Sequence, residues 1–360
     1  MIDIVEGFCM CGIVGAVAER NVVPILLEGL SRLEYRGYDS AGVSVINVQG
    51  GLERVRSVGK VKSLAEKMAE TPSAKGQIGI AHTRWATHGI PEEKNAHPHI
   101  SNDFVSVVHN GIIENFQALR EELQGKGFVF TSDTDTEVIP HCIMDEMTKT
   151  SDLYEAVKAA AARFQGAFSI GVVCKNDPDR LIATRKGSPL VIGVGIGEHF
   201  IASDVAALLP VTSEFIFLEE DDVAILTREA CVIYDVNDEL AERNIETSML
   251  KPQSIELGLH KHFMHKEIFE QPKSLEDTLA NRIYNNSLRV SAFGPEAESI
   301  FKEITNIQIV SCGTSYHAGL VAQYWFEDQL NIPCRVEVAS EYRYRNPAIM
   351  DNTLFITISQ

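Results

Sequence analysis

Residues 11–17 read CGIVGAV, and RLEYRGYDSAG (32–42), AHTRWATHG (81–89), NAHPH (95–99), HNGIIEN (109–115) and TDTEV (134–138) follow in that order. The apolar run over residues 12–18 predicts a buried strand. Pro24 is well placed as a first helical residue and predicts an amphipathic helix over residues 24–35. This opening pair predicts that a sheet begins immediately after Cys11 and that a helix follows its first strand.

Short apolar runs continue through the next two hundred or so residues in the pattern of a sheet-rich domain. Strands are expected over Ile78–His82, Phe104–His109, Phe168–Cys174, Leu190–Val194, Phe215–Leu218, Val223–Thr227 and Cys231–Val236. Helices are expected over Asn115–Gln124, Asp135–Met147 and Leu153–Phe164, with Asp152 as a cap of the last. Many strands in succession with few helices between them predict a layered α+β domain with antiparallel sheets, over residues 11–250.

The pattern changes near residue 250. Residues 251–301 are rich in polar side chains, carry Pro252 and Pro272, and predict a linker that passes into helix. From residue 302 onward, strands are expected at 307–311, 334–338 and 354–358, with a turn at 312–315 and a helix at 316–330. Strands that alternate with helices in this way are typical of parallel βαβ units in a doubly wound sheet.

Composition excludes several classes of function. The 360 residues include 32 Lys and Arg against 50 Asp and Glu, a formal net charge of −18. This balance argues against broad contact with nucleic acid or with an anionic membrane, because both favour a basic surface. The seven cysteines are spread widely without a Cys-x-x-Cys pair, which favours free thiols in a reducing cytoplasm.

Neither a cofactor nor a metal is expected. His97-Pro98-His99 and the group His260, His262 and His265 lack the spacing of zinc-binding helices and have no cysteine partner. No apolar run reaches the ~18 residues of a transmembrane helix, and residues 1–10 lack the basic start of a signal peptide.

The motifs quoted from residues 11–138 together resemble the class II glutamine amidotransferase domain, an N-terminal-nucleophile hydrolase. GSPLVIG (187–193), FIASD (200–204), LLPVT (208–212), FIFLEEDD (215–222), HFMHKEIFEQP (262–272) and CGTSYHAG (312–319) extend the resemblance to one family in that group, the glucosamine-6-phosphate synthases. The resemblance runs from Met10 to Gln360. It implies an αββα fold of two stacked antiparallel sheets, followed by a sugar isomerase (SIS) domain.

The family's reaction supplies the expected chemistry. Glutamine is hydrolysed through a γ-glutamyl thioester, and the ammonia passes to fructose 6-phosphate, which becomes glucosamine 6-phosphate. Cys11 is the implied nucleophile, because a first-residue cysteine carries both a thiol and an α-amine. That amine titrates at roughly 7.7–8.0 and can accept the thiol proton at neutral pH.

Several residues of the motifs are candidates for binding glutamine. A guanidinium binds a carboxylate bidentately, so Arg84 is expected on the α-carboxylate of glutamine. Thr87 and His88 could add donors from the same loop, Asp135 could pair with the α-ammonium, and Trp85 is implied to belong to a lid. Without the family pattern, Arg84 would be a surface charge, Asp135 a helix cap and Trp85 a core residue.

Two donors are expected for the oxyanion that forms when the thiolate attacks the amide. HNGIIEN supplies the side-chain amide of Asn110 and the backbone N–H of Gly111. Taken alone, the same Asn-Gly pair would read as a turn between two apolar runs.

The SIS resemblance implies a sugar-phosphate site at the turn before a helix, where backbone N–H groups face an anion. Thr314 and Ser315 are the candidate ligands, and Ser359 and Gln360 resemble the start of a second phosphate-binding turn. The rest of the first SIS domain, its second copy and the family's ring-opening lysine are not in the sequence. We therefore expect a C-terminally truncated synthase, at most a glutaminase as written, with the full-length protein a homodimer.

Residues 1–10 are expected to be a non-native or cleaved extension, because a peptide bond at Cys11 removes the basic amine. Three alternatives stay open: translation from Met10, a cleaved propeptide, or a retained and inactivating segment. Two other functions also stay open. One is a non-catalytic phosphosugar-binding protein, and the other is an amidotransferase with another acceptor, such as an amidophosphoribosyltransferase.

Overall fold

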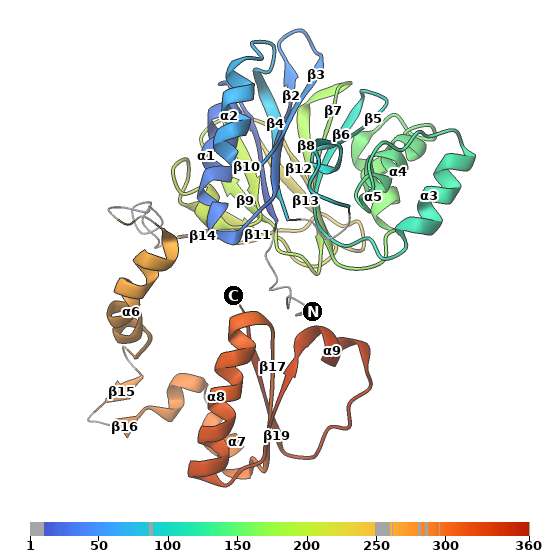
Figure 1. Cartoon of the computed structure of the whole chain (residues 1–360). Coiled ribbons are helices and arrows are strands. Elements are labelled where there is room, and N and C mark those ends of the chain that lie inside the picture. Colours follow the sequence, from blue (N-terminus) through green and yellow to red (C-terminus); the bar gives the residue numbers. More distant parts are fainter. Residues whose placement is uncertain are drawn as a thin grey trace. The chain divides into compact units, whose positions relative to one another are not determined.

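The computed structural model describes residues 11–85, 89–248, 260, 262–279, 282–284, 287–294 and 296–359. The chain divides into two compact units (Figure 1). One holds the described residues between Met10 and Gly258, and the other those between Leu259 and Gln360. The predicted boundary at residue 250 falls outside the described residues. No described helix is both long and apolar enough to cross a membrane.

The first unit is built on two stacked antiparallel sheets. The larger has the order β14-β11-β9-β10-β1-β4-β2-β3. Its strands are β1 (Gly12–Ala18), β2 (Ser40–Asn47), β3 (Leu52–Val58), β4 (Gly76–Arg84), β9 (Val191–Val194), β10 (Glu198–Ala202), β11 (Glu214–Phe217) and β14 (Ile245–Thr247). β1 lies at its centre, between β4 and β10, so the residue before β1 emerges in the middle of the sheet edge.

The smaller sheet has the order β13-β12-β8-β7-β6-β5. Its strands are β5 (His99–Ser101), β6 (Val105–Gly111), β7 (Phe168–Cys174), β8 (Asp177–Lys186), β12 (Val223–Leu226) and β13 (Cys231–Tyr234). A buried apolar layer joins the two sheets, with Ile13 and Ile80 from one meeting Val108 and Leu181 from the other. Both faces of β1 are therefore buried, and its seven side chains are apolar or glycine.

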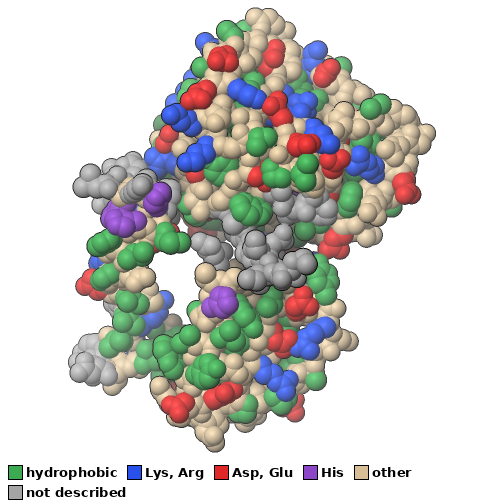
Figure 2. Space-filling model, in the orientation of Figure 1, with side chains coloured by type: hydrophobic (Ala, Val, Ile, Leu, Met, Phe, Trp, Pro, Cys, Tyr) green, Lys and Arg blue, Asp and Glu red, His purple; other side chains and the backbone are tan. Residues whose placement is uncertain are grey.

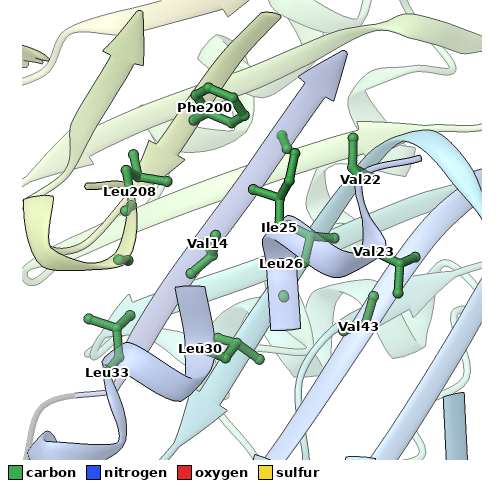
Figure 3. Packing of buried hydrophobic residues seen from close by; sticks show 14 of the residues in the cluster. Val14, Val22, Val23, Ile25, Leu26, Leu30, Leu33, Val43, Phe200 and Leu208 are labelled. Atoms are coloured by element: carbon green, nitrogen blue, oxygen red, sulfur yellow. The ribbon is translucent and has the colours of Figure 1, made fainter. Parts of the chain in front are cut away.

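Helices cover the outer face of each sheet. The larger sheet is covered by α1 (Val23–Arg32) and α2 (Val61–Ala69), and the smaller by α3 (Phe116–Gly125), α4 (Val138–Glu146) and α5 (Leu153–Ala161). Figure 3 shows Leu26 and Leu30 of α1 packed toward Val14 of β1. The predicted αββα arrangement of two antiparallel sheets is thus confirmed.

Several elements differ from the expectation. Residues 40–69 carried no expected element but form β2, β3 and α2, because small and polar side chains such as Ser40 and Ser44 are buried in the sheet. β8 begins in the charged segment Asp177–Arg180, which has the composition of a turn but pairs with β7 as a hairpin. β10 and β14 were also not expected.

The second unit contains a parallel three-stranded sheet of order β18-β17-β19. Its elements are α7 (Ala297–Glu303), β17 (Asn306–Ser311), α8 (Gly313–Leu330), β18 (Cys334–Val338), α9 (Ala339–Tyr344) and β19 (Thr353–Ile358). Before them come α6 (Phe263–Leu279), with Pro272 inside it, and the short pair β15 (Ile283–Tyr284) and β16 (Ser287–Leu288). The parallel βαβ pattern is as predicted. The expected helix in the polar segment 251–301 is also found, as α6.

Charged side chains of both signs are interspersed over the face of the first unit shown in Figure 2. That face of the first unit is therefore not uniformly basic.

Candidate active site

Cys11 lies where the ends of strands from both sheets meet. β1 and β4 pair with Gly12 opposite Thr83, which brings the residues after Thr83 beside Cys11. The backbone N–H of Trp85 donates to Sγ of Cys11 at 3.2 Å, and Sγ lies 3.6 Å from the Trp85 carbonyl oxygen. The end of β4 therefore fixes the position of the thiol.

The thiol of Cys11 is half-buried, and its surroundings favour the protonated form. Desolvation by burial raises its pKa to about 11, although the Trp85 N–H and the charge of Arg84 act in the opposite direction. A thiol with this pKa is almost entirely protonated at pH 7 and is not yet a nucleophile. Catalysis by Cys11 therefore requires a base close to Sγ.

The Asn110 side chain reaches Cys11 from the smaller sheet, and Gly111 follows Asn110 as the last residue of β6. The Asn110 Nδ2 donates to the carbonyl oxygen of Cys11 at 2.9 Å. Gly111 has φ of 122°, and a Cβ built on it would lie 2.0 Å from the carbonyl oxygen of Ala167. Only glycine fits so close to the neighbouring backbone, so Gly111 is required by the geometry of this strand end.

Arg84 is the last residue of β4, and its side chain is buried. One guanidinium nitrogen lies 3.6 Å from Oδ1 of Asp39, and the other donates to the carbonyl oxygen of Gly89 at 2.8 Å. The Asp39 N–H in turn donates to the Arg84 carbonyl oxygen at 2.7 Å. These bonds hold the guanidinium at the base of the loop that follows Trp85, so its positive charge stays close to Cys11.

Asp135 is buried, and its Oδ2 accepts a hydrogen bond from the Ile113 N–H at 2.9 Å. Ile113 follows closely on Gly111 in the sequence, so this contact places Asp135 just beyond the end of β6. The predicted start of the helix at Asp135 is wrong, because α4 begins at Val138 with Glu137 before it, and the helix ends at Glu146. Asp135 is consequently not the cap of this helix.

The remaining predicted glutamine ligands are placed in part. The Trp85 side chain is 37% exposed, and it begins the loop in which Thr87 and His88 fall. Thr87 and His88 lie outside the described residues. The structure thus brings Cys11, Arg84, Trp85, Asn110, Gly111 and Asp135 to one end of the two sheets.

The predicted sugar-phosphate residues lie at one edge of the parallel sheet of the second unit. β17 and β19 pair with Ser311 opposite Ile358, so Thr314, Ser315 and Ser359 follow the carboxyl ends of neighbouring strands. α8 begins at Gly313 rather than at the predicted residue 316, because the extended backbone of Cys312 starts the helix earlier. Thr314 and Ser315 therefore lie in its first turn, and Gln360 lies outside the described residues.

Comparison with known proteins identifies both units. A glutamine amidotransferase domain model matches residues 82–210, and a SIS domain model matches residues 300–360. Curated relatives named glutamine–fructose-6-phosphate aminotransferase (isomerizing) share 54% identity over 351 residues in Pseudomonas aeruginosa and 52% in Yersinia pseudotuberculosis, covering 98% of this chain. This chain belongs to their family. It spans 57% of the length of each of these relatives.

Solved structures support the fold of this family member. A glutamine phosphoribosylpyrophosphate amidotransferase from Bacillus subtilis matches with a TM-score of 0.55 and 20% identity, over 91% of this chain and 65% of that one. At this identity the likeness shows the fold alone.

Two residues that contact the site were not predicted. Asp39 pairs with Arg84, and His82 lies with its Nε2 2.9 Å from Oδ1 of Asn110. Asp39 stands in a polar stretch just before a strand, and His82 stands inside an apolar one. Only their occurrence within long family motifs could have singled them out, because nothing in their local pattern points to a site.

Four buried histidines lie beneath the site of this family member: His82, His97, His99 and His109. The ring of His97 stacks on His82 with centroids 4.0 Å apart, and it lies 4.9 Å from His99 and 6.4 Å from His109. Burial lowers the pKa of all four, that of His82 to about 3. Among the described residues, no group of His, Cys, Asp and Glu is arranged to hold a metal ion.

These histidines predict a loss of stability in acid. The unfolded chain takes up protons below pH ~6.5, whereas the folded chain cannot do so until the lowered pKa values are reached. Stability is therefore present above pH ~6.5 and is lost as the pH falls, by at most about 1.4 kcal/mol per pH unit for each group. Urea unfolding of a Trp325→Phe variant, followed by Trp85 fluorescence, should show a midpoint that drops between pH 7 and pH 4.

A matched variant tests the cause of this acid sensitivity. His97→Phe keeps a ring on His82 but removes one titrating group, so the dependence of unfolding free energy on pH should become less steep. A midpoint that does not change between pH 7 and pH 5, or an unchanged slope in His97→Phe, would contradict the assignment to the buried histidines.

Proposed function

We propose that the first unit hydrolyses glutamine through a thioester on Cys11. The observation that carries this proposal is the hydrogen bond from the Asn110 side-chain amide to the carbonyl oxygen of Cys11, with Gly111 next to Asn110 at the end of β6. A protein that only binds its ligand has no use for a nucleophile beside two such donors. The family models and the names of the relatives support the same activity.

The chemistry follows from these positions. Sγ of Cys11 loses its proton to a base and attacks the side-chain amide carbon of glutamine, and the amide oxygen takes up the negative charge. N–H groups of Asn110 and Gly111 stabilise this oxyanion. Its collapse breaks the C–N bond, and the base returns the proton to the leaving ammonia. Water then attacks the thioester, releases glutamate and restores the thiol.

The base in this scheme is the α-amine of Cys11, available when Cys11 is the first residue of the mature chain. No side chain is needed for the proton transfer, because the amine and the thiol belong to one residue. We assign the glutamine α-carboxylate to Arg84 and the α-ammonium to Asp135. Trp85, Thr87 and His88 are proposed to complete the binding loop.

For the whole protein, we propose that the ammonia aminates fructose 6-phosphate to give glucosamine 6-phosphate. The phosphate is assigned to the first turn of α8, because the backbone N–H groups at the start of a helix favour an anion. Thr314, Ser315 and Ser359 are assigned to this site together with Gln360. The homodimer implied by the family resemblance is proposed for the complete protein only.

Incubation of the purified protein with glutamine tests the first half of the proposal. Glutamate and ammonia should form in equal amounts, and added hydroxylamine should divert the thioester to γ-glutamyl hydroxamate. The intact mass shows whether Cys11 is the first residue. A folded protein that begins with Cys11 and releases no glutamate would refute the proposed hydrolysis. The proposed transfer of ammonia is tested separately, by adding fructose 6-phosphate and measuring glucosamine 6-phosphate.

An Arg84→Gln variant should bind glutamine weakly. Loss of the charge-assisted contact with the α-carboxylate is expected to raise KM for glutamine by about 10²-fold, with a smaller effect on kcat. Initial rates of glutamate formation measure both constants. Arg20→Gln is the matched control, because Arg20 makes an exposed ion pair with Glu198, and an equal rise of KM in both variants would count against the assignment.

A further inference from the structure

The orientation of the Asn110 amide is fixed by its two neighbours. One edge of the amide lies 2.9 Å from the carbonyl oxygen of Cys11, which has no proton to give, so this edge must be the N–H edge. The opposite edge is therefore Oδ1, and it lies 2.9 Å from Nε2 of His82. Because an amide oxygen only accepts, Nε2 of His82 must carry a proton.

At neutral pH the neutral His82 ring carries one N–H proton, on either Nδ1 or Nε2. Its side chain is fully buried, and burial lowers its pKa to about 3, with the charges of His109 and Arg84 acting in the same direction. Nδ1 lies within the usual hydrogen-bond distance of no partner among the described residues, although the His109 backbone also interacts with the ring and acts to raise its pKa. The neutral ring with its proton on Nε2 is the one form that satisfies Asn110.

The plane of the His82 ring is held from one side by His97. The two rings stack with centroids 4.0 Å apart and planes 17° apart. The backbone of His97 is itself confined, because a Cβ added to Gly42 of β2 would lie 2.1 Å from the His97 carbonyl oxygen. The stack therefore has little freedom to rotate His82 away from Asn110.

From this geometry we propose that His82 is a positioning residue for glutamine hydrolysis, whose Nε2–H holds the Asn110 amide with its nitrogen toward the oxyanion. This inference rests on the proposed glutaminase function. If the Asn110 side-chain amide rotated by half a turn, Oδ1 would replace Nδ2 beside the reacting carbon. An oxygen lone pair would then face the developing negative charge. The site would lose one donor and gain a repulsion.

Two variants separate positioning from packing. His82→Phe keeps an aromatic ring on His97 but cannot donate, so kcat for glutamine hydrolysis should fall about 10²-fold with little change in KM. His82→Gln loses the ring but can donate through its amide, and it should restore kcat to within about tenfold of the parent. If the role of His82 is only to pack against His97, the order is reversed and His82→Phe is the more active variant, which would overturn the inference.

Alkylation of Cys11 by iodoacetamide serves as an internal control. This substitution forms no oxyanion, so its rate should be the same in His82→Phe as in the parent. An equal loss of alkylation and of hydrolysis would mean that the variant has displaced the nucleophile, which contradicts a role confined to Asn110.

The tautomer of His82 can be determined by NMR, independently of any glutaminase activity. In the full chain labelled with ¹⁵N-histidine, the signals that disappear in His82→Gln should show a protonated Nε2 and a bare Nδ1, unchanged from pH 7.5 to pH 5.5. A proton on Nδ1 would overturn the inference even in an active protein. If the parent lacks glutaminase activity but shows the Nε2–H tautomer, the proposed function fails while the positioning of Asn110 stands.

Discussion

Cys11→Ala should abolish glutamine hydrolysis, with kcat lowered on the order of 10⁵-fold. When the catalytic groups of an enzyme act as a unit, removing the nucleophile alone lowers kcat about as much as removing all of them. The proposed oxyanion donors, Asn110 and Gly111, stay in place, but they have no tetrahedral intermediate to stabilise. Glutamate release, measured over hours with a large amount of protein, sets the upper limit for the residual rate.

Cys231→Ala is the matched control for this substitution. Cys231 is also half-buried but lies in β13 of the smaller sheet, away from the strand ends that meet at Cys11. Its replacement should leave hydroxamate formation and covalent capture by an electrophilic glutamine analogue unchanged. Capture of the Cys11→Ala chain by that analogue, at the parent's rate, would show that another thiol is the nucleophile.

Asn110→Leu should lower kcat by about 10²- to 10³-fold while KM for glutamine changes little. The Asn110 amide is proposed to bind the oxygen of the reacting amide only as it becomes an oxyanion, so its loss acts on the transition state rather than on substrate binding. Leu has a similar size and removes the donor without opening a cavity. Initial rates over a range of glutamine concentrations separate the two constants.

The control for Asn110 is Asn237→Leu in an exposed turn, where the side-chain amide donates to Oδ2 of Asp235 at 3.3 Å. This variant should keep the parent's kcat. A rise of KM in Asn110→Leu with kcat preserved would instead make Asn110 a ground-state ligand of glutamine and would remove it from the oxyanion site.

The sequence predicts the layers of the first unit because its buried strands are strongly apolar. β1 and most of β6 and β7 carry apolar or small side chains on both faces, a pattern typical of buried strands. β2 and the start of β8 lack such a pattern, because their buried serines and charged hairpin residues have the composition of loops. Only pairing with neighbouring strands turns these segments into strands, and pairing is not visible in local periodicity.

The candidate site is predictable to the extent that its residues lie in long motifs. Cys11, Arg84, Asn110 and Asp135 are found in this way, and the structure brings them together at one end of the two sheets. Their partners are harder to predict, since His82 meets Asn110 from a different sheet. A histidine within an apolar strand has the pattern of a core residue, and only three-dimensional contact shows which side chain it orients.

The close approach of Gly42 to the carbonyl oxygen of His97 affects how substitutions in this chain should be interpreted. Gly42 contacts no substrate in the proposed mechanism, and a survey of residues near the nucleophile would pass over it. Any side chain there must push the segment that carries His97, and through the ring stack it must also disturb His82 and Asn110. A loss-of-function variant at Gly42 would therefore be a catalytic lesion caused by a misplaced backbone.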